Sequence, residues 1–375
     1  MRDAMTTELT AEHRELMARF RAGQRAALAR VISIVENQRP GFQQLLHATH
    51  PGARDAVRIG ITGPPGAGKS TITAELIRRF RAADRTVGVI AVDPTSPYTG
   101  GALLGDRIRM SEVAQDDGVF IRSMATRGAL GGLAATTREV MDVVAAFGFD
   151  LVLVETVGVG QSELDIAAAA DTTAVVLVPE SGDSIQTMKA GLMEAADLFV
   201  VNKADRPGAD RLAREVEMML HLRLGEAMKN IPAHHGVQLG RAETGRAKQG
   251  TRQQRAAGGT AAGDQVAGTG PDGTEGESWA IPVLLTTAET GDGLDVVVQK
   301  LAEHAEWLAS SGELERRRRS RLVERVRDAV QQQLLVRAWQ DGPGSVLLEE
   351  SLSDLVAGRT TPYEVAARIV REATG

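Results

Sequence analysis

The chain has no cysteine in its 375 residues. This absence excludes disulfide bonds, thiolate metal sites and cysteine nucleophiles, and it fits a reducing compartment. The sequence also has no run near the roughly 18 uninterrupted apolar residues that a membrane-spanning helix needs. Its first residues, MRDAMTTELT, lack the pattern of a secretory signal. We therefore expect a soluble, cytoplasmic protein with no membrane partner.

Positive charge is in the minority, because 43 Lys and Arg residues stand against 49 Asp and Glu residues, for a formal net charge of −6. This balance argues against a general nucleic-acid binder, so we expect no nucleic-acid partner. Hydrophobic residues make up 43% of the chain and charged residues 25%, as in ordinary globular proteins.

Short apolar, β-rich runs alternate with helix-compatible segments through most of the chain. Strands are predicted at 57–62, 87–92, 119–121, 151–154, 174–178, 198–201 and 282–286. Helices are predicted between most of them, at 70–82, 133–147, 184–196 and 210–228. This alternation predicts an α/β fold with a mostly parallel central sheet and helices on both faces.

Helical patterns flank this core, which predicts an N-terminal helical extension over 1–56, an α/β domain over 57–312 and a C-terminal helical segment over 313–375. Within the α/β domain, residues 240–278 are mainly Gly, Ala, Thr, Gln and charged residues, with Val266 as the only large apolar side chain. Such a segment buries too little surface to offset its ordering entropy, so we predict a disordered insert.

The C-terminal segment carries a stripe of apolar residues four apart, formed by Leu322, Val326, Val330, Leu334 and Ala338. The run RRRR at 316–319 favours a solvated helix face, and an interaction patch is the alternative.

The stretch GPPGAGKST follows one predicted strand and opens a predicted helix, and it fits the phosphate-binding pattern G-x-x-x-x-G-K-[ST]. Backbone N–H groups of such a loop, together with the helix N-terminus, bind phosphates. We expect Lys69 to reach the β and γ oxygens and the Ser70 hydroxyl to bind Mg²⁺. The predicted nucleotide contacts in this loop are Gly63, Pro64, Pro65, Gly66, Ala67, Gly68, Lys69, Ser70 and Thr71.

The motif Asn202-Lys203-Ala204-Asp205 follows the predicted strand LFVV and resembles the guanine-reading motif of GTPases. A carboxylate at Asp205 can accept hydrogen bonds from both N1–H and the 2-amino group of guanine, whereas adenine would leave it desolvated and unpartnered. Thr287 and Ala288 follow the strand PVLLT, where GTPases place a last loop against the base. The predicted nucleotide is therefore GTP or GDP.

Acidic residues end two further predicted strands. Glu155 and Gly158, in ETVG, take the place of a Walker-B acid and of a γ-phosphate-sensing turn, and Glu155 could hold Mg²⁺ directly or through water. Asp93 opens a glycine-rich stretch that runs to Asp106 and beyond. These two acids could reach the metal in one conformational state, and a flexible loop without metal contact is the alternative.

Five motifs occur in one order along the chain, namely GPPGAGKST, AVDPTSPYTGGALLGDRIRM, RSMATRGALGG, LVETVGVGQSE and VNKAD. Together they closely resemble the MeaB, or methylmalonic aciduria type A, family, which is also called ArgK-like. The likeness covers residues 8–235 and 279–372. It implies a P-loop NTPase of the metallochaperone-related GTPase class, with a C-terminal helical dimerisation arm.

The resemblance also implies a function. Its members are homodimeric GTPase chaperones of methylmalonyl-CoA mutase or a related adenosylcobalamin-dependent acyl-CoA mutase, and adenosylcobalamin enters only through that partner. A cobalamin adenosyltransferase is a further candidate partner. By the same resemblance, Lys69, Asp93, Asp106 and Glu155 serve hydrolysis, Ser70 joins the three acids at Mg²⁺, and a switch at the partner interface includes Glu180, Asp183 and Lys189.

Slow intrinsic hydrolysis is predicted, because Val159 follows the ETVG turn where Ras-like GTPases place a water-orienting Gln. Two other functions stay open at this point. One is an ATP-dependent kinase of a transport protein, an old label of ArgK-like sequences, which NKAD argues against. The other is a nickel or cobalt metallochaperone, which the lack of Cys and the seven scattered His argue against.

Overall fold

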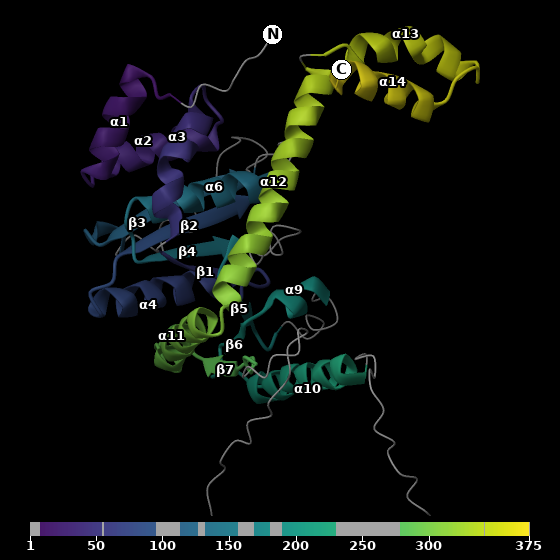
Figure 1. The fold of residues 1–375 in the computed structure, drawn as a ribbon. Helices are drawn as coiled ribbons and strands as arrows, with labels where there is room; N and C mark the ends of the chain where they lie inside the picture. Colours follow the sequence, from purple (N-terminus) through teal and green to yellow (C-terminus); the bar gives the residue numbers. More distant parts are fainter. Residues whose placement is uncertain are drawn as a thin grey trace, which may run out of the picture. The chain divides into compact units, whose positions relative to one another are not determined.

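The computed structural model describes residues 8–54, 56–94, 113–126, 132–156, 169–180, 190–229, 278–340 and 342–374 (Figure 1). The chain divides into two compact units, one made of Met1–Ala213 with Ile281–Gly375 and the other of Arg214–Ala280. All but Ser278 of the predicted insert 240–278 lies outside the described residues. The three-part domain division stays a prediction. Among the described residues, no helix combines the length and the apolar character needed to cross a membrane.

The centre of the first unit is a seven-stranded sheet in which every pairing is parallel. The strand order is β3-β2-β4-β1-β5-β6-β7. The strands are β1 (Val57–Thr62), β2 (Val87–Pro94), β3 (Val119–Thr126), β4 (Leu151–Thr156), β5 (Thr172–Leu177), β6 (Leu198–Asn202) and β7 (Val283–Thr286). Each predicted strand is present within a few residues, which confirms the predicted fold class.

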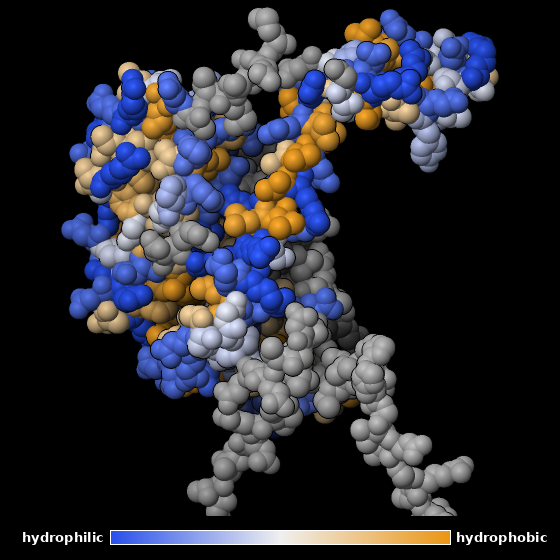
Figure 2. Space-filling model, viewed as in Figure 1, coloured by the Kyte–Doolittle hydropathy of each residue, from blue (hydrophilic) through white to orange (hydrophobic). Residues whose placement is uncertain are grey.

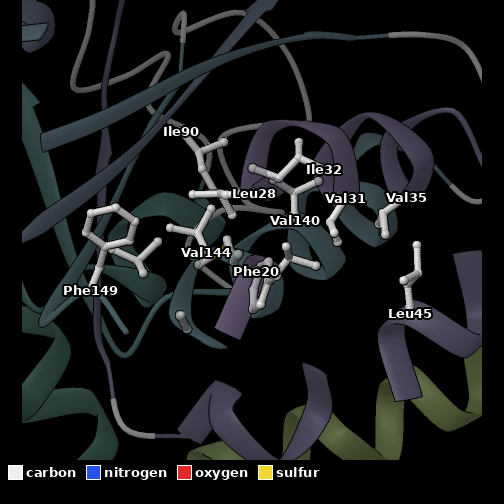
Figure 3. Packing of buried hydrophobic residues seen from close by; sticks show 14 of the residues in the cluster. Phe20, Leu28, Val31, Ile32, Val35, Leu45, Ile90, Val140, Val144 and Phe149 are labelled. Carbon is white, nitrogen blue, oxygen red and sulfur yellow. The ribbon is translucent and has the colours of Figure 1, made fainter. Parts of the chain in front are cut away.

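Continuous apolar strands are explained by burial on both faces of this sheet. Val87 and Val89 of β2 point into one hydrophobic cluster, while Ile90 and Val92 of the same strand point into another. The first cluster includes residues of α4 (Lys69–Ala82) and α11 (Leu294–Ser310). The second includes residues of α2 (Arg25–Glu36) and α6 (Gly132–Ala146), several of which are drawn in Figure 3.

The helical lead-in consists of three separate helices, α1 (Ala11–Arg21), α2 and α3 (Phe42–Thr49), followed by the 3-10 turn η1 (His50–Arg54). Phe20, Leu28, Val31 and Leu45 from these helices are buried in the second cluster (Figure 3). The remaining short elements before the C-terminal helices are η2 (Val113–Gln115), α9 (Ala190–Ala195) and α10 (Ala209–Lys229).

The C-terminal segment forms α12 (Glu313–Trp339), α13 (Gly344–Val356) and α14 (Pro362–Thr374). The predicted stripe lies on α12, but its apolar side chains face outward, since Leu322, Val326, Val330 and Leu334 are 40–63% exposed. Orange atoms along α12 mark this surface in Figure 2. Only Ala338 of the stripe is buried, beside α14 residues Val365 and Ile369.

The reading of RRRR at 316–319 as a solvated face is wrong for two of its four residues. Arg316 and Arg319 are exposed, as expected. Arg317 and Arg318 are half-buried and form ion pairs with Asp197 and Asp171, at 3.0 and 2.7 Å. The polar face of α12 therefore meets the rest of the unit, and its apolar face does not.

A buried acid lies where α6 meets α12. Glu139 Oε2 is buried and has no hydrogen-bond partner within the described part of the chain. Burial raises the pKa of Glu139 to about 7, an effect that the charge of Arg325 opposes and that of Asp142 reinforces. A carboxyl group whose pKa rises on folding stabilises the fold below its unfolded pKa, here 4.5, and that contribution is lost as the pH rises through 7.

The wild-type chain should therefore lose about 2 kcal/mol of unfolding free energy between about pH 5 and pH 8 that a Glu139→Gln variant retains. Urea unfolding at the two pH values measures this difference. Glu315→Gln, at an exposed position on α12, is the control and should keep the wild-type pH dependence. The same pH dependence in Glu139→Gln and the wild type would contradict the assignment.

Candidate functional site

The loop between β1 and α4 is held in a conformation that requires glycine. Gly63 has φ +137°, and a Cβ there would lie 2.1 Å from Val176 O on β5. Gly68, the N-cap of α4, has φ +87°, and its Cβ would lie 2.3 Å from Asn202 Nδ2. A side chain at either position would therefore displace a neighbouring strand or loop. The loop ends at the N-terminus of a 14-residue helix, which favours an anion.

Lys69 is buried at the start of α4, and its ammonium group lies against the loop itself. Nζ donates hydrogen bonds to the carbonyl oxygens of Gly63 and Pro64, at 2.8 and 2.9 Å. A buried cation in this position supplies a fixed positive charge to the space that the loop encloses. Pro65 and Gly66, at the tip of the loop, are exposed, whereas Ala67 is buried.

Ser70 and Glu155 meet beside this lysine. Both are buried, and Ser70 Oγ donates a hydrogen bond to Glu155 Oε1 at 2.5 Å. The structure thus brings together the predicted metal-binding hydroxyl of α4 and the predicted acid at the end of β4. Two buried oxygen ligands that face each other fit the preference of Mg²⁺ for hard oxygen donors. Next to them, Thr156 Oγ1 donates to Thr62 Oγ1 at 3.1 Å, which joins β4 to the start of the loop.

Asn202 ties the phosphate loop to the two loops predicted at the base. Its Nδ2 donates to Ala67 O at 2.8 Å, and its Oδ1 accepts from Ala288 N at 3.0 Å and from Thr286 Oγ1 at 3.3 Å. All four residues are buried. Sequence reasoning missed Thr286, although a hydroxyl at the last position of β7, directly before Thr287, was the available signal.

Replacing Asn202 by alanine should lower the unfolding free energy by about 2–3 kcal/mol, because buried donors and acceptors on three segments lose their partner. Urea unfolding measures this loss. Asn37→Ala is the matched control, since Asn37 is exposed at the end of α2, and it should change stability by about 0.5 kcal/mol or less. Equal losses for the two variants would contradict the bridging role of Asn202.

The loop after β6 presents the remaining residues of the base motif. Lys203 has a positive φ of 58°, Asp205 is exposed, and Ala204 N donates to Thr286 O at 2.9 Å. Thr287 N donates to Asp292 O at 3.0 Å, which closes the loop after β7. The loops after β6 and β7 are therefore held side by side, next to the phosphate loop.

Glu180, predicted in a partner-facing switch, lies beside the base motif. Its carboxylate is 3.7 Å from Lys203 Nζ and also pairs with Arg206. The residues that follow it, 181–189, lie outside the described residues, and so do the predicted Asp183 and Lys189.

Three other predicted site residues have no described side chain. Asp93 is in β2, with its side chain undescribed, and Asp106 and Gly158 lie outside the described residues. Thr71, in the first turn of α4, is half-buried. Among the residues that the structure describes, no three His, Cys, Asp or Glu side chains gather as a metal-binding group.

Relatives with GTPase names match most of the chain. A provisionally named GTPase of Pyrococcus abyssi is 43% identical over 316 residues, which are 84% of this chain and 83% of that protein. Escherichia coli GTPase ArgK is 45% identical over 195 residues, or 51% of this chain and 59% of that one. A mouse protein named methylmalonic aciduria type A homolog, mitochondrial, is 40% identical over 197 residues, or 49% and 48% of the two chains.

A solved structure shares the fold. The crystal structure described as LAO/AO transport system kinase aligns with a TM-score of 0.61 at 25% identity, over 98% of this chain and 100% of that one. The model of one sequence family, described as methylmalonyl-CoA mutase-associated GTPase MeaB, matches residues 28–342. With its phosphate loop, its base motif and this match in agreement, the chain belongs to the MeaB family of GTPases.

Proposed function

We propose that this GTPase is a chaperone that gates cofactor loading of an adenosylcobalamin-dependent acyl-CoA mutase and protects that enzyme, with methylmalonyl-CoA mutase as the first candidate. The family description, which names mutase association, supports this proposal. The single observation that carries the nucleotide part is Asn202, whose side chain joins the phosphate loop to the base loops. One nucleotide contacting both ends of this arrangement would report on its own phosphate state.

The nucleotide is GTP or GDP, bound by the predicted residues of the phosphate loop and by Gly158, Asn202, Lys203, Asp205, Thr287 and Ala288. Lys69 places positive charge on the β and γ oxygens, where charge develops during transfer. Ser70 and Glu155 are the described residues that would hold Mg²⁺, joined by Asp93 and Asp106. When bound, the ion would neutralise phosphate charge.

Hydrolysis serves as a switch in this proposal. GTP would hold the loops 93–110, 155–163 and 180–189 through contacts to the γ-phosphate and Mg²⁺, and hydrolysis would release them. Asp183 and Lys189 would then carry the change to the partner. The intrinsic rate would be slow until the partner completes the site.

The test combines the purified chain with purified methylmalonyl-CoA mutase and measures GTP turnover and complex formation. We expect at least about tenfold stimulation of turnover, and mutase binding that differs between GDP and a non-hydrolysable GTP analogue. A turnover rate unchanged by mutase, with binding indifferent to nucleotide, would contradict the proposal. Isobutyryl- and ethylmalonyl-type mutases in parallel reactions identify the preferred partner.

A homodimer through the C-terminal arm is part of the proposal. The exposed stripe on α12 supports it, because contiguous apolar side chains on a polar helix mark an interaction surface. Val326→Asp combined with Val330→Asp should convert the dimer into monomers in sedimentation analysis. Leu222→Asp, at an equally exposed position on α10, is the control and should leave the dimer intact. A monomeric wild-type chain, or a dimer indifferent to the double change, would contradict this arm.

A further inference from the structure

Two buried aspartates lie at the opposite edge of the sheet from the nucleotide loops. Asp171 directly precedes β5, Asp197 directly precedes β6, and they are 2% and 6% exposed. Neither belongs to the predicted nucleotide site. A carboxylate at this depth persists only when cations and hydrogen-bond donors compensate its lost hydration.

The compensating cations come from one face of α12. Arg318 Nη2 lies 2.7 Å from Asp171 Oδ2, and Arg321 also pairs with Asp171. Arg317 Nη1 lies 3.0 Å from Asp197 Oδ1 and donates to the carbonyl oxygen of Asp171 at 3.1 Å. Burial acts to raise the pKa of Asp171, but hydrogen bonding from Arg318 and the charges of both arginines outweigh it and lower that pKa.

The same aspartates fix the alignment of three strands. Arg58 N, on β1, donates to Asp171 Oδ2 at 3.3 Å, and Asp171 N donates back to Arg58 O at 2.9 Å. Thr173 N, on β5, donates to Asp197 Oδ2 at 2.8 Å, and Asp197 N donates to Thr173 O at 2.9 Å. Through these bonds the arginines of α12 hold β1, β5 and β6 in one register at their amino-terminal ends.

The carboxyl-terminal ends of these strands carry the nucleotide loops. β1 leads into the phosphate loop, β5 leads to Glu180, and β6 ends at Asn202 of the base motif. Each strand spans five or six residues, about 20 Å at the usual rise, and adjacent strands are joined by parallel ladders. A shift of β6 against β1 at one edge therefore changes the offset between phosphate and base loops at the other.

We propose that Arg317 and Arg318 are positioning residues of the nucleotide site, acting through Asp197 and Asp171 to set the spacing between the phosphate and base loops. The inference rests on guanine-nucleotide binding as proposed above. It also makes the docking of α12 and the affinity for nucleotide thermodynamically linked, so that nucleotide should tighten the attachment of this helix.

Arg325 offers a matched comparison on the same helix. Its guanidinium lies 2.6 Å from the buried Asp142 of α6, at an exposure close to that of Arg318. The loss of either arginine strands a buried carboxylate, but Asp142 belongs to a helix and not to a strand that carries a nucleotide loop. Arg316, exposed and paired with Glu313 on its own helix, is the surface control.

The experiment measures the GDP dissociation constant and the melting temperature of the full chain with Arg318→Gln, Arg325→Gln or Arg316→Gln. We expect Arg318→Gln to weaken GDP binding about tenfold, within the range by which distant residues modulate a site. Arg325→Gln should lower the melting temperature by a similar amount yet change GDP affinity less than about twofold, and Arg316→Gln should change neither.

Arg318→Lys, which keeps the charge, covers the case in which Arg318→Gln does not fold, and we expect it to weaken GDP binding less than tenfold but measurably. GDP affinity at the wild-type value in a folded Arg318 variant, or an equal loss in Arg325→Gln, would overturn the inference while leaving the proposed function standing. A wild-type chain that does not bind GDP would instead contradict the proposed function.

Discussion

Replacing Lys69 by alanine should lower GTP turnover by about 10²–10³-fold with the fold retained. The reason is the position of its ammonium group, which is buried and held by the carbonyl oxygens of Gly63 and Pro64, where a bound triphosphate would lie. A fixed charge of this kind acts on the transition state and cannot be supplied by water. Single-turnover assays with saturating enzyme measure the chemical step separately from binding.

Arg78→Ala is the control for this experiment, because Arg78 lies on the same helix and its side chain is 43% exposed. It should keep turnover close to the wild type. Near-normal turnover in Lys69→Ala, with circular dichroism and melting temperature unchanged, would contradict the assignment of Lys69 to phosphate transfer.

Replacing Asp205 by asparagine should weaken GDP binding by about 10–100-fold and improve binding of xanthosine diphosphate. The asparagine loses the charged acceptor for the guanine N1–H and 2-amino groups, and its amide can donate to the additional carbonyl group of xanthine. Since Asp205 is exposed, the change should not disturb packing. Asp210→Asn, at an exposed position early in α10, serves as the control and should keep guanine preference. An Asp205→Asn variant that still prefers GDP would show that another group reads the base.

Much of the fold could be predicted because its signals are local. Runs such as LVLV and VGVIAV are apolar on both faces of the strand, and a strand of this kind is stable only inside a covered parallel sheet. The phosphate loop and NKAD were likewise predicted from short motifs at strand ends. In a parallel sheet those ends meet at one edge, so Ser70 and Glu155 could be expected near one another.

The role of α12 could not be predicted, because it depends on contacts distant in sequence. Arg318 and Asp171 are 147 residues apart, and a charge run followed by apolar residues usually turns its apolar side inward. On α12 the arginines face two buried strand-end carboxylates and the apolar stripe faces outward. The same limit applies to Glu180, whose pairing with the base motif requires β5 and β6 to be neighbours.

The most direct test of the central claim, a guanine-nucleotide site, is calorimetric titration of the wild-type chain with GDP and with ADP in the same Mg²⁺ buffer. Two charge-assisted hydrogen bonds to the base predict that GDP binds at least about a hundredfold more tightly than ADP. ADP binding as tight as GDP binding would contradict it and favour an ATP-dependent activity.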